Sequence, residues 1–448
     1  MKAFHAYDIR GVYNKDFNKE DVYKIGYYLP GVLNAQKVLV GRDIRESSPE
    51  IFNFLTKGIT DAGADVYTAG LTTTPMVYWA TAKHGFDASV MITASHNDSE
   101  YNGLKVSKTN ALPVGYDTGL KTIEEKIITA KPIIPVKEKG IIKEIQILDE
   151  YLAFQMQFLK DISSLKIALD CSNGMAGILI KQLLGNQASY LNDQPDGTFP
   201  GHAPNPLVAK NIVQLQSAVA QHHCDVGVIF DGDADRVMFV DEQGEFISPD
   251  LMIGLLGHYF LEQKKQTGAV LQDIRSSKAV GEYLQKMGGT MHTWRVGRAY
   301  AALKLREING LFGGELAGHY YFRDFYYSDS GIMAALIILG LLNEFKNMGV
   351  SVSQVIARIK KYANSGEINF RIERKQAAMD AVKNHFTDLE TPTASFDFDG
   401  YRIEYPQWWF NIRPSNTEPY LRLLVEASST QLLDEKVLEI KKILEKFS

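Results

Sequence analysis

The stretch Met91-Ile-Thr-Ala-Ser-His-Asn97 joins an apolar run to a polar turn, and it is the most informative part of this chain. The apolar letters predict a buried strand, and the turn then presents one hydroxyl, that of Ser95, at the tip of the strand. A serine hydroxyl needs activation or modification before it can react. The Gly-x-Ser-x-Gly elbow of the α/β-hydrolases does not surround it. We therefore expect Ser95 to carry covalent chemistry, and phosphoryl transfer is favoured over acyl transfer.

A second motif, Asp231-Gly-Asp-Ala-Asp-Arg236, lies between two apolar runs that read as strands. Carboxylates at alternate positions share one side of an extended segment. Hard oxygen ligands of this kind suit Mg²⁺, which usually completes its octahedral shell with water or phosphate oxygen. The motif therefore predicts a magnesium site on Asp231, Asp233 and Asp235, with a phosphorylated Ser95 supplying a further oxygen.

A calcium-binding loop is the alternative for the same motif. The three aspartates match positions 1, 3 and 5 of an EF-hand loop, and Glu242 falls at position 12. However, Arg236 stands at position 6, where the EF-hand requires glycine. The flanks also read as strands, whereas an EF-hand loop joins two helices. The magnesium interpretation is preferred for these reasons.

The two motifs and several others resemble the α-D-phosphohexomutases, the phosphomannomutase/phosphoglucomutase superfamily. The likeness extends over almost the whole chain, and the motifs occur in the family's order. The further motifs are Ala6-Tyr-Asp-Ile-Arg-Gly11, Gly41-Arg-Asp-Ile-Arg-Glu-Ser-Ser48, Tyr101-Asn-Gly-Leu-Lys105, Gly313-Gly-Glu-Leu-Ala-Gly-His319 and Arg413-Pro-Ser-Asn-Thr-Glu-Pro419. Any one of these could arise by chance, but their combination and order are specific to the superfamily.

The resemblance implies an isomerase that interconverts hexose 1-phosphate and hexose 6-phosphate through a phosphoserine. The implied cofactors are Mg²⁺ and a hexose 1,6-bisphosphate, which is both the intermediate and the activator. The segments 319–325 and 329–331 are similar to those of bacterial phosphomannomutase/phosphoglucomutase members. Phosphoglucosamine mutases usually carry Gln where Leu316 stands. Mannose and glucose phosphates are therefore the expected substrates, with glucosamine phosphate as the alternative.

The resemblance also assigns roles to individual residues. Ser95 is the phosphoryl donor, and charge neutralisation or proton transfer falls to Arg10, Lys105, Arg236 and His319. Substrate binding falls to Tyr7, His96, Arg275, Gly297, Arg298, Glu315, Arg413, Ser415, Asn416 and Thr417. In the C-terminal loop that begins at Arg413, the Arg side chain, the hydroxyls of Ser415 and Thr417 and backbone donors would bind the phosphate that is not reacting, as in an anion nest.

Three departures from the family pattern bear on substrate preference. Asp98 stands where proline usually follows the serine loop, and it adds a negative charge beside a phosphate site. The segment Gly313–His319 resembles the family's sugar-binding loop, and in it Ala317 replaces a common serine, so one hydroxyl contact to the substrate is missing. Arg298 replaces a common histidine, and its guanidinium can bind phosphate with two N–H groups. The reaction class is unaffected by these changes.

Composition agrees with a large enzyme that acts on small molecules. The chain has 448 residues, 45% hydrophobic and 23% charged, and a formal charge of −5. A net negative charge does not favour binding to nucleic acid, which requires a basic surface. The first ten residues lack the order of a signal peptide, and the longest apolar stretch, 331–342, is too short to span a bilayer. With only two cysteines, far apart, we expect a cytoplasmic protein with no membrane or nucleic-acid partner.

Apolar runs that end in Gly or Asp alternate with stretches of helical periodicity, which predicts α/β layers. The expected strands cover 37–43, 165–170, 226–230 and 269–273, and the clearest helices cover 49–62, 208–222 and 328–346. The expected domains are 1–140, 141–244 and 245–364, all α/β, and a smaller α+β domain, 365–448. The resemblance implies that the first three are related in topology and that the active site lies in a central cleft.

Two functions of other kinds remain open at this point. Asp98 and Ala317 could mark an enzyme that has lost turnover and only binds sugar phosphates. A metal-dependent sugar phosphatase would result if water reached the phosphoserine. Among residues outside these motifs, His222, His223 and Cys224 lack a second ligand pair and are expected at an edge of the protein. Trp408 and Trp409 are expected to pack at a domain interface.

Overall fold

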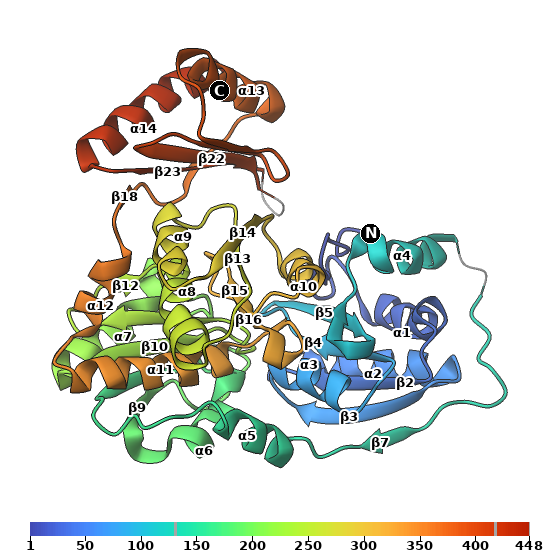
Figure 1. The fold of residues 1–448 in the computed structure, drawn as a ribbon. Coiled ribbons are helices and arrows are strands. Elements are labelled where there is room, and N and C mark those ends of the chain that lie inside the picture. The colour runs from blue at the N-terminus through green and yellow to red at the C-terminus, as the bar shows by residue number, and fades with distance from the viewer. Residues whose placement is uncertain (130–131, 416–418, 448) are drawn as a thin grey trace.

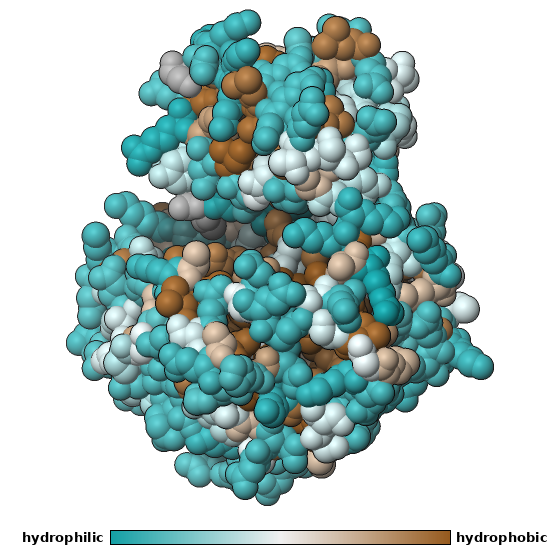
Figure 2. All heavy atoms as spheres, turned by 90° about the vertical axis from the view of Figure 1, so that its left-hand side faces the viewer, coloured by the Kyte–Doolittle hydropathy of each residue, from teal (hydrophilic) through white to brown (hydrophobic). Residues whose placement is uncertain are grey.

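The computed structural model describes residues 1–129, 132–415 and 419–447. Four sheets organise these residues, and each is covered by its own helices (Figure 1). The first three sheets form one broad body, and the fourth stands on top of it at the C-terminal end (Figure 1). Seen from the side, the surface is hollowed between this C-terminal lobe and the body below (Figure 2).

The first sheet has the strand order β1-β5-β4-β2-β3-β7, with β6 paired to β5. Its parallel centre is built from β2, β3 and β4, while β5 runs antiparallel to β4. The last strand, β7, begins two residues beyond the division expected at 140. The elements are β1 (Ile9–Val12), α1 (Lys19–Leu33), β2 (Lys37–Arg42), α2 (Ser48–Asp61), β3 (Asp65–Leu71), α3 (Thr74–Lys83), β4 (Ala88–Ile92), β5 (Tyr101–Lys108), β6 (Leu112–Pro113), α4 (Leu120–Thr129) and β7 (Ile142–Glu144).

The second sheet has the order β12-β11-β10-β8-β9, and the third has the order β14-β13-β15-β16-β17. The second comprises α5 (Leu148–Met156), β8 (Ile167–Asp170), α6 (Ile180–Leu184), β9 (Ala188–Leu191), α7 (Ala209–His222), β10 (Val226–Phe230), β11 (Val237–Asp241) and β12 (Phe246–Ile247). The third comprises α8 (Pro249–Gly257), β13 (Ala269–Asp273), α9 (Lys278–Gln285), β14 (Thr290–Trp294), α10 (Arg298–Glu307), β15 (Phe312–Gly314), β16 (Tyr320–Phe322), β17 (Ser328–Asp329), α11 (Gly331–Asn347) and α12 (Val352–Ile359).

The three sheets share one topology. In each, the first strand of a parallel trio is central, with the second strand on one side and the third on the other. A fourth strand then returns antiparallel beside the third, as β5 does beside β4, β11 beside β10 and β16 beside β15. The expected relation between the three α/β units is therefore confirmed.

The fourth sheet is antiparallel, with the order β18-β23-β22-β21-β20 and β19 also paired to β23. Two helices cover it, which confirms the α+β class of the C-terminal part (Figure 1). Its elements are β18 (Ala363–Asn364), β19 (Ile368–Phe370), α13 (Lys375–Leu389), β20 (Ala394–Phe396), β21 (Tyr401–Glu404), β22 (Trp408–Pro414), β23 (Leu421–Ala427) and α14 (Thr430–Leu444).

One large hydrophobic core joins the second and third sheets and extends to α3 of the first. Helix α11 runs through it, and almost every side chain of this helix is buried, because the sequence is apolar on all sides. It begins at Ser330, whose hydroxyl accepts a hydrogen bond from the Met333 amide, as an N-cap does. Within the described ranges, no single helix is long and apolar enough to cross a membrane; α11 and α12, bent by 105°, pass that test only as a pair.

Candidate active site

The predicted catalytic motifs occupy the same place in each of the three related sheets. Residues 93–100 connect β4 to β5, residues 231–236 connect β10 to β11, and residues 315–319 connect β15 to β16. Each connection follows the carboxyl end of the third parallel strand, the edge at which α/β sheets commonly bind ligands. The shared topology thus repeats one kind of turn three times. Contacts between the three turns show that they meet.

Ser95 is buried and lies in the left-handed backbone region, with φ of 53°. This conformation is uncommon for a residue other than glycine and is found where neighbouring groups impose it. Here the Ser95 amide donates to the Thr93 hydroxyl at 2.9 Å. The Ser95 hydroxyl donates to Asp231 Oδ2 at 2.8 Å, across 136 residues of sequence. The nucleophile expected from the sequence therefore lies directly against the expected metal motif.

The three aspartates of this motif are fully buried, and one carboxylate oxygen from each lies within 4.8 Å of the others. Burial, together with the charges of Asp233 and Asp235, raises the pKa of Asp231 well above its usual value. Among the described residues, Asp233 Oδ1 and Asp235 Oδ1 have no hydrogen-bond partner. Buried carboxylate oxygens without a partner are costly, and a divalent cation removes that cost. The donor set therefore fits a hard cation that prefers oxygen.

An ammonium group and a hydroxyl group from the first α/β unit bind other oxygens of this cluster. Lys105 Nζ, on β5, lies 2.6 Å from Asp233 Oδ2 and 2.5 Å from Asp235 Oδ2. The Thr74 hydroxyl, at the start of α3, donates to the same Asp233 oxygen. Burial raises the pKa of Asp235, but Lys105 and His319 outweigh it and lower that pKa overall. The metal motif is thus tied to the first sheet on both sides of the serine loop.

His319 faces the cluster from the third sheet, and its two ring nitrogens have different partners. Nδ1 lies 2.7 Å from Asp329 Oδ2, and Nε2 accepts from Arg236 Nε at 3.0 Å. A carboxylate can only accept, so the ring proton lies on Nδ1 and leaves Nε2 as an acceptor. Arg236 Nε also lies 3.8 Å from Asp231. The histidine is therefore oriented by Asp329, in the way a general base is oriented.

Arg298 supports this arrangement at the start of α10. Its Nε donates to Asp329 Oδ1 at 3.0 Å, and its guanidinium lies 3.9 Å from the centre of the Tyr78 ring. Burial raises the pKa of Asp329, yet Arg298 and His319 outweigh it and lower that pKa to about 2. Arg298, which replaces the family's common histidine, is therefore linked to His319 through Asp329, since both side chains bind that carboxylate.

The loop 315–319, which is expected to bind the sugar, is joined to the neighbouring segment 296–297 through buried Glu315. Glu315 Oε1 accepts from the Gly297 amide at 2.7 Å, and Oε2 accepts from the Tyr321 hydroxyl at 3.0 Å. Gly297 has φ of 126°, and a Cβ on it would lie 2.7 Å from the Tyr7 ring. The Tyr7 hydroxyl donates to the Val296 carbonyl at 3.2 Å. Tyr7, from the first unit, thus closes against the third unit at a point where only glycine fits.

Arginines from the first, third and fourth units border the same region. Arg10 Nη1 donates to Asn97 Oδ1 at 2.9 Å and to the Ala94 carbonyl at 3.3 Å, so it lies against the serine loop. Arg275 is held by Asp273 at 2.7 Å. Arg413, on β22, lies 3.5 Å from Asp399, and both burial and the charge of Arg275 lower its pKa.

Of the remaining expected site residues, His96 and Ser415 are described. His96 Nδ1 lies 3.5 Å from the Ser95 hydroxyl, and burial with nearby Arg236 and Arg10 lowers its pKa well below the usual value. The Ser415 amide donates to the Tyr420 carbonyl at 2.9 Å. Asn416 and Thr417 lie outside the described residues.

Three residues of the site were missed in the sequence. Asp329 ends the short strand β17, Thr74 begins α3 within the run Thr72-Thr-Thr-Pro75, and Arg45 belongs to the Gly41–Ser48 motif. A polar residue at a strand end or a helix start is a signal that could have flagged the first two. Their main partners lie at least ten residues away or in another sheet, and no local pattern reveals such contacts.

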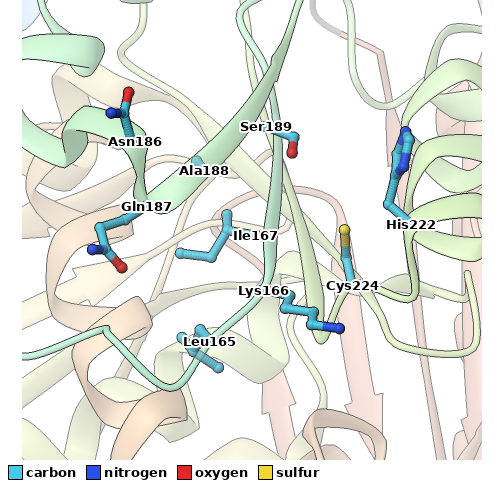
Figure 3. Close-up of a pocket in the computed structure, with 9 residues that line it drawn as sticks. All are labelled: Leu165, Lys166, Ile167, Asn186, Gln187, Ala188, Ser189, His222 and Cys224. Carbon is cyan, nitrogen blue, oxygen red and sulfur yellow. The ribbon is translucent and has the colours of Figure 1, made fainter.

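Two of the three residues expected at an edge, His222 and Cys224, line a separate pocket beside β8 and β9 (Figure 3). This pocket has a volume of about 270 Å³, and its lining includes Ser189, His222 and Cys224. The Cys224 sulfur and the His222 ring lie on the same side of the opening (Figure 3). Trp409 is buried in the fourth sheet, where its indole N–H donates to Glu426 at 2.6 Å.

Fold and site together define a class: an enzyme of phosphoryl transfer made of three repeated α/β units and a C-terminal α+β unit. Comparison with known families agrees. Four family descriptions match in order, namely phosphoglucomutase/phosphomannomutase alpha/beta/alpha domains I, II and III and the C-terminal domain. The matched residues are 1–132, 149–244, 248–362 and 367–443.

Individual relatives match along their whole length. The chain is 35% identical over 451 residues to the phosphomannomutase of Methanocaldococcus jannaschii, covering 100% of this chain and 98% of that protein. It is 35% identical to a phosphomannomutase of Escherichia coli, covering 99% of each. A solved phosphoglucomutase/phosphomannomutase family protein from Burkholderia thailandensis superposes with a TM-score of 0.89 at 26% identity, covering 99% of this chain and 97% of that one. The chain therefore belongs to the phosphoglucomutase/phosphomannomutase family and is a mutase, that is, an isomerase.

Proposed function

We propose that this mutase interconverts the 1- and 6-phosphates of a hexose, mannose or glucose, with Ser95 as the phosphoserine that gives and takes back the phosphoryl group. The observation that carries the proposal is the contact between the Ser95 hydroxyl and the buried aspartate cluster. The full-length relatives named phosphomannomutase support the choice of sugar. Hexose phosphates are the proposed partners, and a hexose 1,6-bisphosphate is the proposed activator, because it would phosphorylate Ser95.

Asp231, Asp233 and Asp235 would hold Mg²⁺ together with an oxygen on Ser95. This assignment is supported by the all-carboxylate donor set and by the buried Oδ1 atoms of Asp233 and Asp235, which have no hydrogen-bond partner among the described residues. When bound, Mg²⁺ supplies positive charge that stabilises the transferring phosphoryl group and its leaving oxygen. Lys105, which already bridges two of the aspartates, would keep the remaining negative charge of the cluster balanced.

Proton transfer is proposed for His319. As the phosphorus–oxygen bond to Ser95 breaks, a bond forms to the sugar hydroxyl, and that hydroxyl must lose its proton. His319 Nε2 becomes the acceptor once Arg236, whose Nε donates to it at 3.0 Å, turns to the phosphoryl oxygens, and Asp329 holds the other ring nitrogen in its protonated form. Arg236 and Arg10 would then neutralise the phosphoryl oxygens, since both already lie against the serine loop or the metal motif. In the return half of the reaction, the same histidine gives the proton back.

The rest of the site would hold the sugar in either of its two orientations. Glu315 would accept from ring hydroxyls, and Arg413, with the rest of its loop, would bind the phosphate that is not reacting. Arg413 Nε is buried without a partner among the described residues, which supports a role in binding an anion. Tyr7, His96, Arg275, Gly297 and Arg298 are proposed to line the space between these two groups.

The test is ³¹P NMR of the protein with Mg²⁺, a trace of hexose 1,6-bisphosphate, and either mannose 1-phosphate or glucose 1-phosphate. Growth of the 6-phosphate signal is expected for the native chain and should be absent in Ser95→Ala. Ser99→Ala is the matched control, because Ser99 is an exposed hydroxyl of the same loop. Turnover by Ser95→Ala at the native rate would refute the role of Ser95. Release of inorganic phosphate without any 6-phosphate would refute the mutase assignment in favour of a phosphatase.

A further inference from the structure

The loop that carries Ser95 is built around one buried guanidinium. Arg45 follows β2, is 1% exposed, and points into the bend formed by residues 95–101. Loop carbonyls turned inward need hydrogen-bond partners, because water does not reach them. Here the partners come from this one side chain.

Arginine offers five N–H groups in a rigid planar fork. The Arg45 Nη2 group donates to the carbonyls of Ser95, at 3.0 Å, and Asn97, at 2.6 Å. Its Nη1 group donates to the carbonyls of Asp98, at 2.6 Å, and Tyr101, at 3.0 Å. The fifth, on Nε, donates to Asp43 Oδ2 at 3.1 Å. Every donor of the fork therefore has a partner; three of the five partners belong to the serine loop, and a fourth, Tyr101, is the first residue of β5.

The Arg45 guanidinium also contacts the second α/β unit. The ring of Phe199 lies 4.9 Å from its centre, a cation–π contact. A Cβ on Gly197 would lie 2.5 Å from the Ile44 carbonyl, so the two backbones touch beside Arg45. The metal motif, residues 231–236, lies on the other side of the Ser95 carbonyl, since a Cβ on Gly232 would be 2.4 Å from that oxygen. The Ser95 carbonyl is thus fixed between Arg45 and the loop of the aspartates.

We infer that Arg45 is a positioning residue for the phosphoryl transfer: its five hydrogen bonds hold Ser95 in its left-handed conformation and fix the distance between the serine and the aspartate cluster. The inference deepens the proposed role of Ser95 and rests on it. Among the described residues, the guanidinium of Arg45 contacts residues 95–101, Asp43 and Phe199, so it acts through the loop. Displacing a reacting group by about 1 Å can lower a rate about 100-fold, which is why such a residue matters.

The experiment compares the native chain with Arg45→Lys. Lysine keeps the charge but has three donors on one atom, so it cannot serve five acceptors. We expect kcat to fall by about 10- to 100-fold, with KM within about threefold of native, because the substrate contacts are untouched. Amide hydrogen exchange of residues 93–101 should become faster, and the ³¹P signal of the phosphoserine should shift. Arg42→Lys is the control, since Arg42 precedes the same turn but is only half-buried.

Native kcat, native exchange and an unchanged ³¹P shift in a folded Arg45→Lys would overturn the inference. If circular dichroism shows that Arg45→Lys does not fold, Asp43→Asn decides, because it keeps all five donors and removes only the charged anchor of the fork. A smaller fall in kcat with faster exchange in the loop is then expected, and native behaviour would overturn the inference. If the native chain shows no mutase activity, the proposed function fails, while the exchange comparison still tests whether Arg45 holds the loop.

Discussion

Asp329→Asn is the substitution that most directly tests the proposed proton transfer. Asp329 accepts from His319 Nδ1 at 2.7 Å with one oxygen and from Arg298 Nε at 3.0 Å with the other. Asparagine keeps one acceptor and replaces the second with a donor. If its oxygen faces Arg298, its NH₂ faces Nδ1 and forces the ring proton to Nε2. If its oxygen faces His319, two donors meet at Arg298.

The expected cost follows from these two arrangements. In the first, His319 can no longer accept a proton at Nε2, so the whole general-base contribution, typically about 10²- to 10⁴-fold, is lost. This corresponds to about 2.7–5.4 kcal/mol, at 1.36 kcal/mol for each tenfold change in rate. In the second, the buried Arg298 loses its charge partner, which costs about 3–5 kcal/mol of stability. Because the second arrangement leaves Arg298 facing a donor, the first should predominate, and we therefore expect kcat to fall at least 100-fold. The melting temperature should also drop, because Arg298 loses its charged partner.

The assay is steady-state formation of hexose 6-phosphate, at a temperature where circular dichroism shows both proteins folded. Asp324→Asn is the matched control, since Asp324 is an exposed carboxylate only five residues away, and it should keep native kcat. A folded Asp329→Asn with kcat within threefold of native would refute the view that Asp329 orients His319. KM should change little in either variant, because neither residue is placed against the sugar.

Three further outcomes are expected. Chelation with EDTA should abolish turnover and added Mg²⁺ should restore it, whereas activity of the chelated protein would contradict the metal assignment. Tyr7→Phe removes the hydrogen bond to the Val296 carbonyl and should lower the free energy of unfolding by about 0.5–1.5 kcal/mol in urea titration; no change would mean that this bond between units is not formed in solution. Gly297→Ala should raise KM and lower the melting temperature, because φ of 126° and the Tyr7 ring exclude a Cβ; a variant indistinguishable from the native chain would show that the two segments do not meet.

Local patterns in the sequence were sufficient for the fold class, and together with the family resemblance they predicted which turns would carry the candidate catalytic groups. The expected strands 226–230 and 269–273 coincide with β10 and β13. The expected helix 49–62 is displaced by one residue from α2, and the expected helix 208–222 begins one residue before α7. These segments are predictable because hydrophobic periodicity and turn residues act over a few positions. The motifs around Ser95 and the three aspartates are equally local, since each lies within one turn.

The sequence by itself determined which turns carry reactive groups, because a turn is specified by a few adjacent residues. Only the tertiary structure decided how those turns meet. Ser95 contacts Asp231 across 136 residues, and Lys105 contacts Asp233 across 128, through sheets whose equivalent strand ends face one another. Arg45 and Asp329 were missed for the same reason. Their roles depend on burial and on partners brought close by packing, and a side chain acquires such partners only when separate sheets come together.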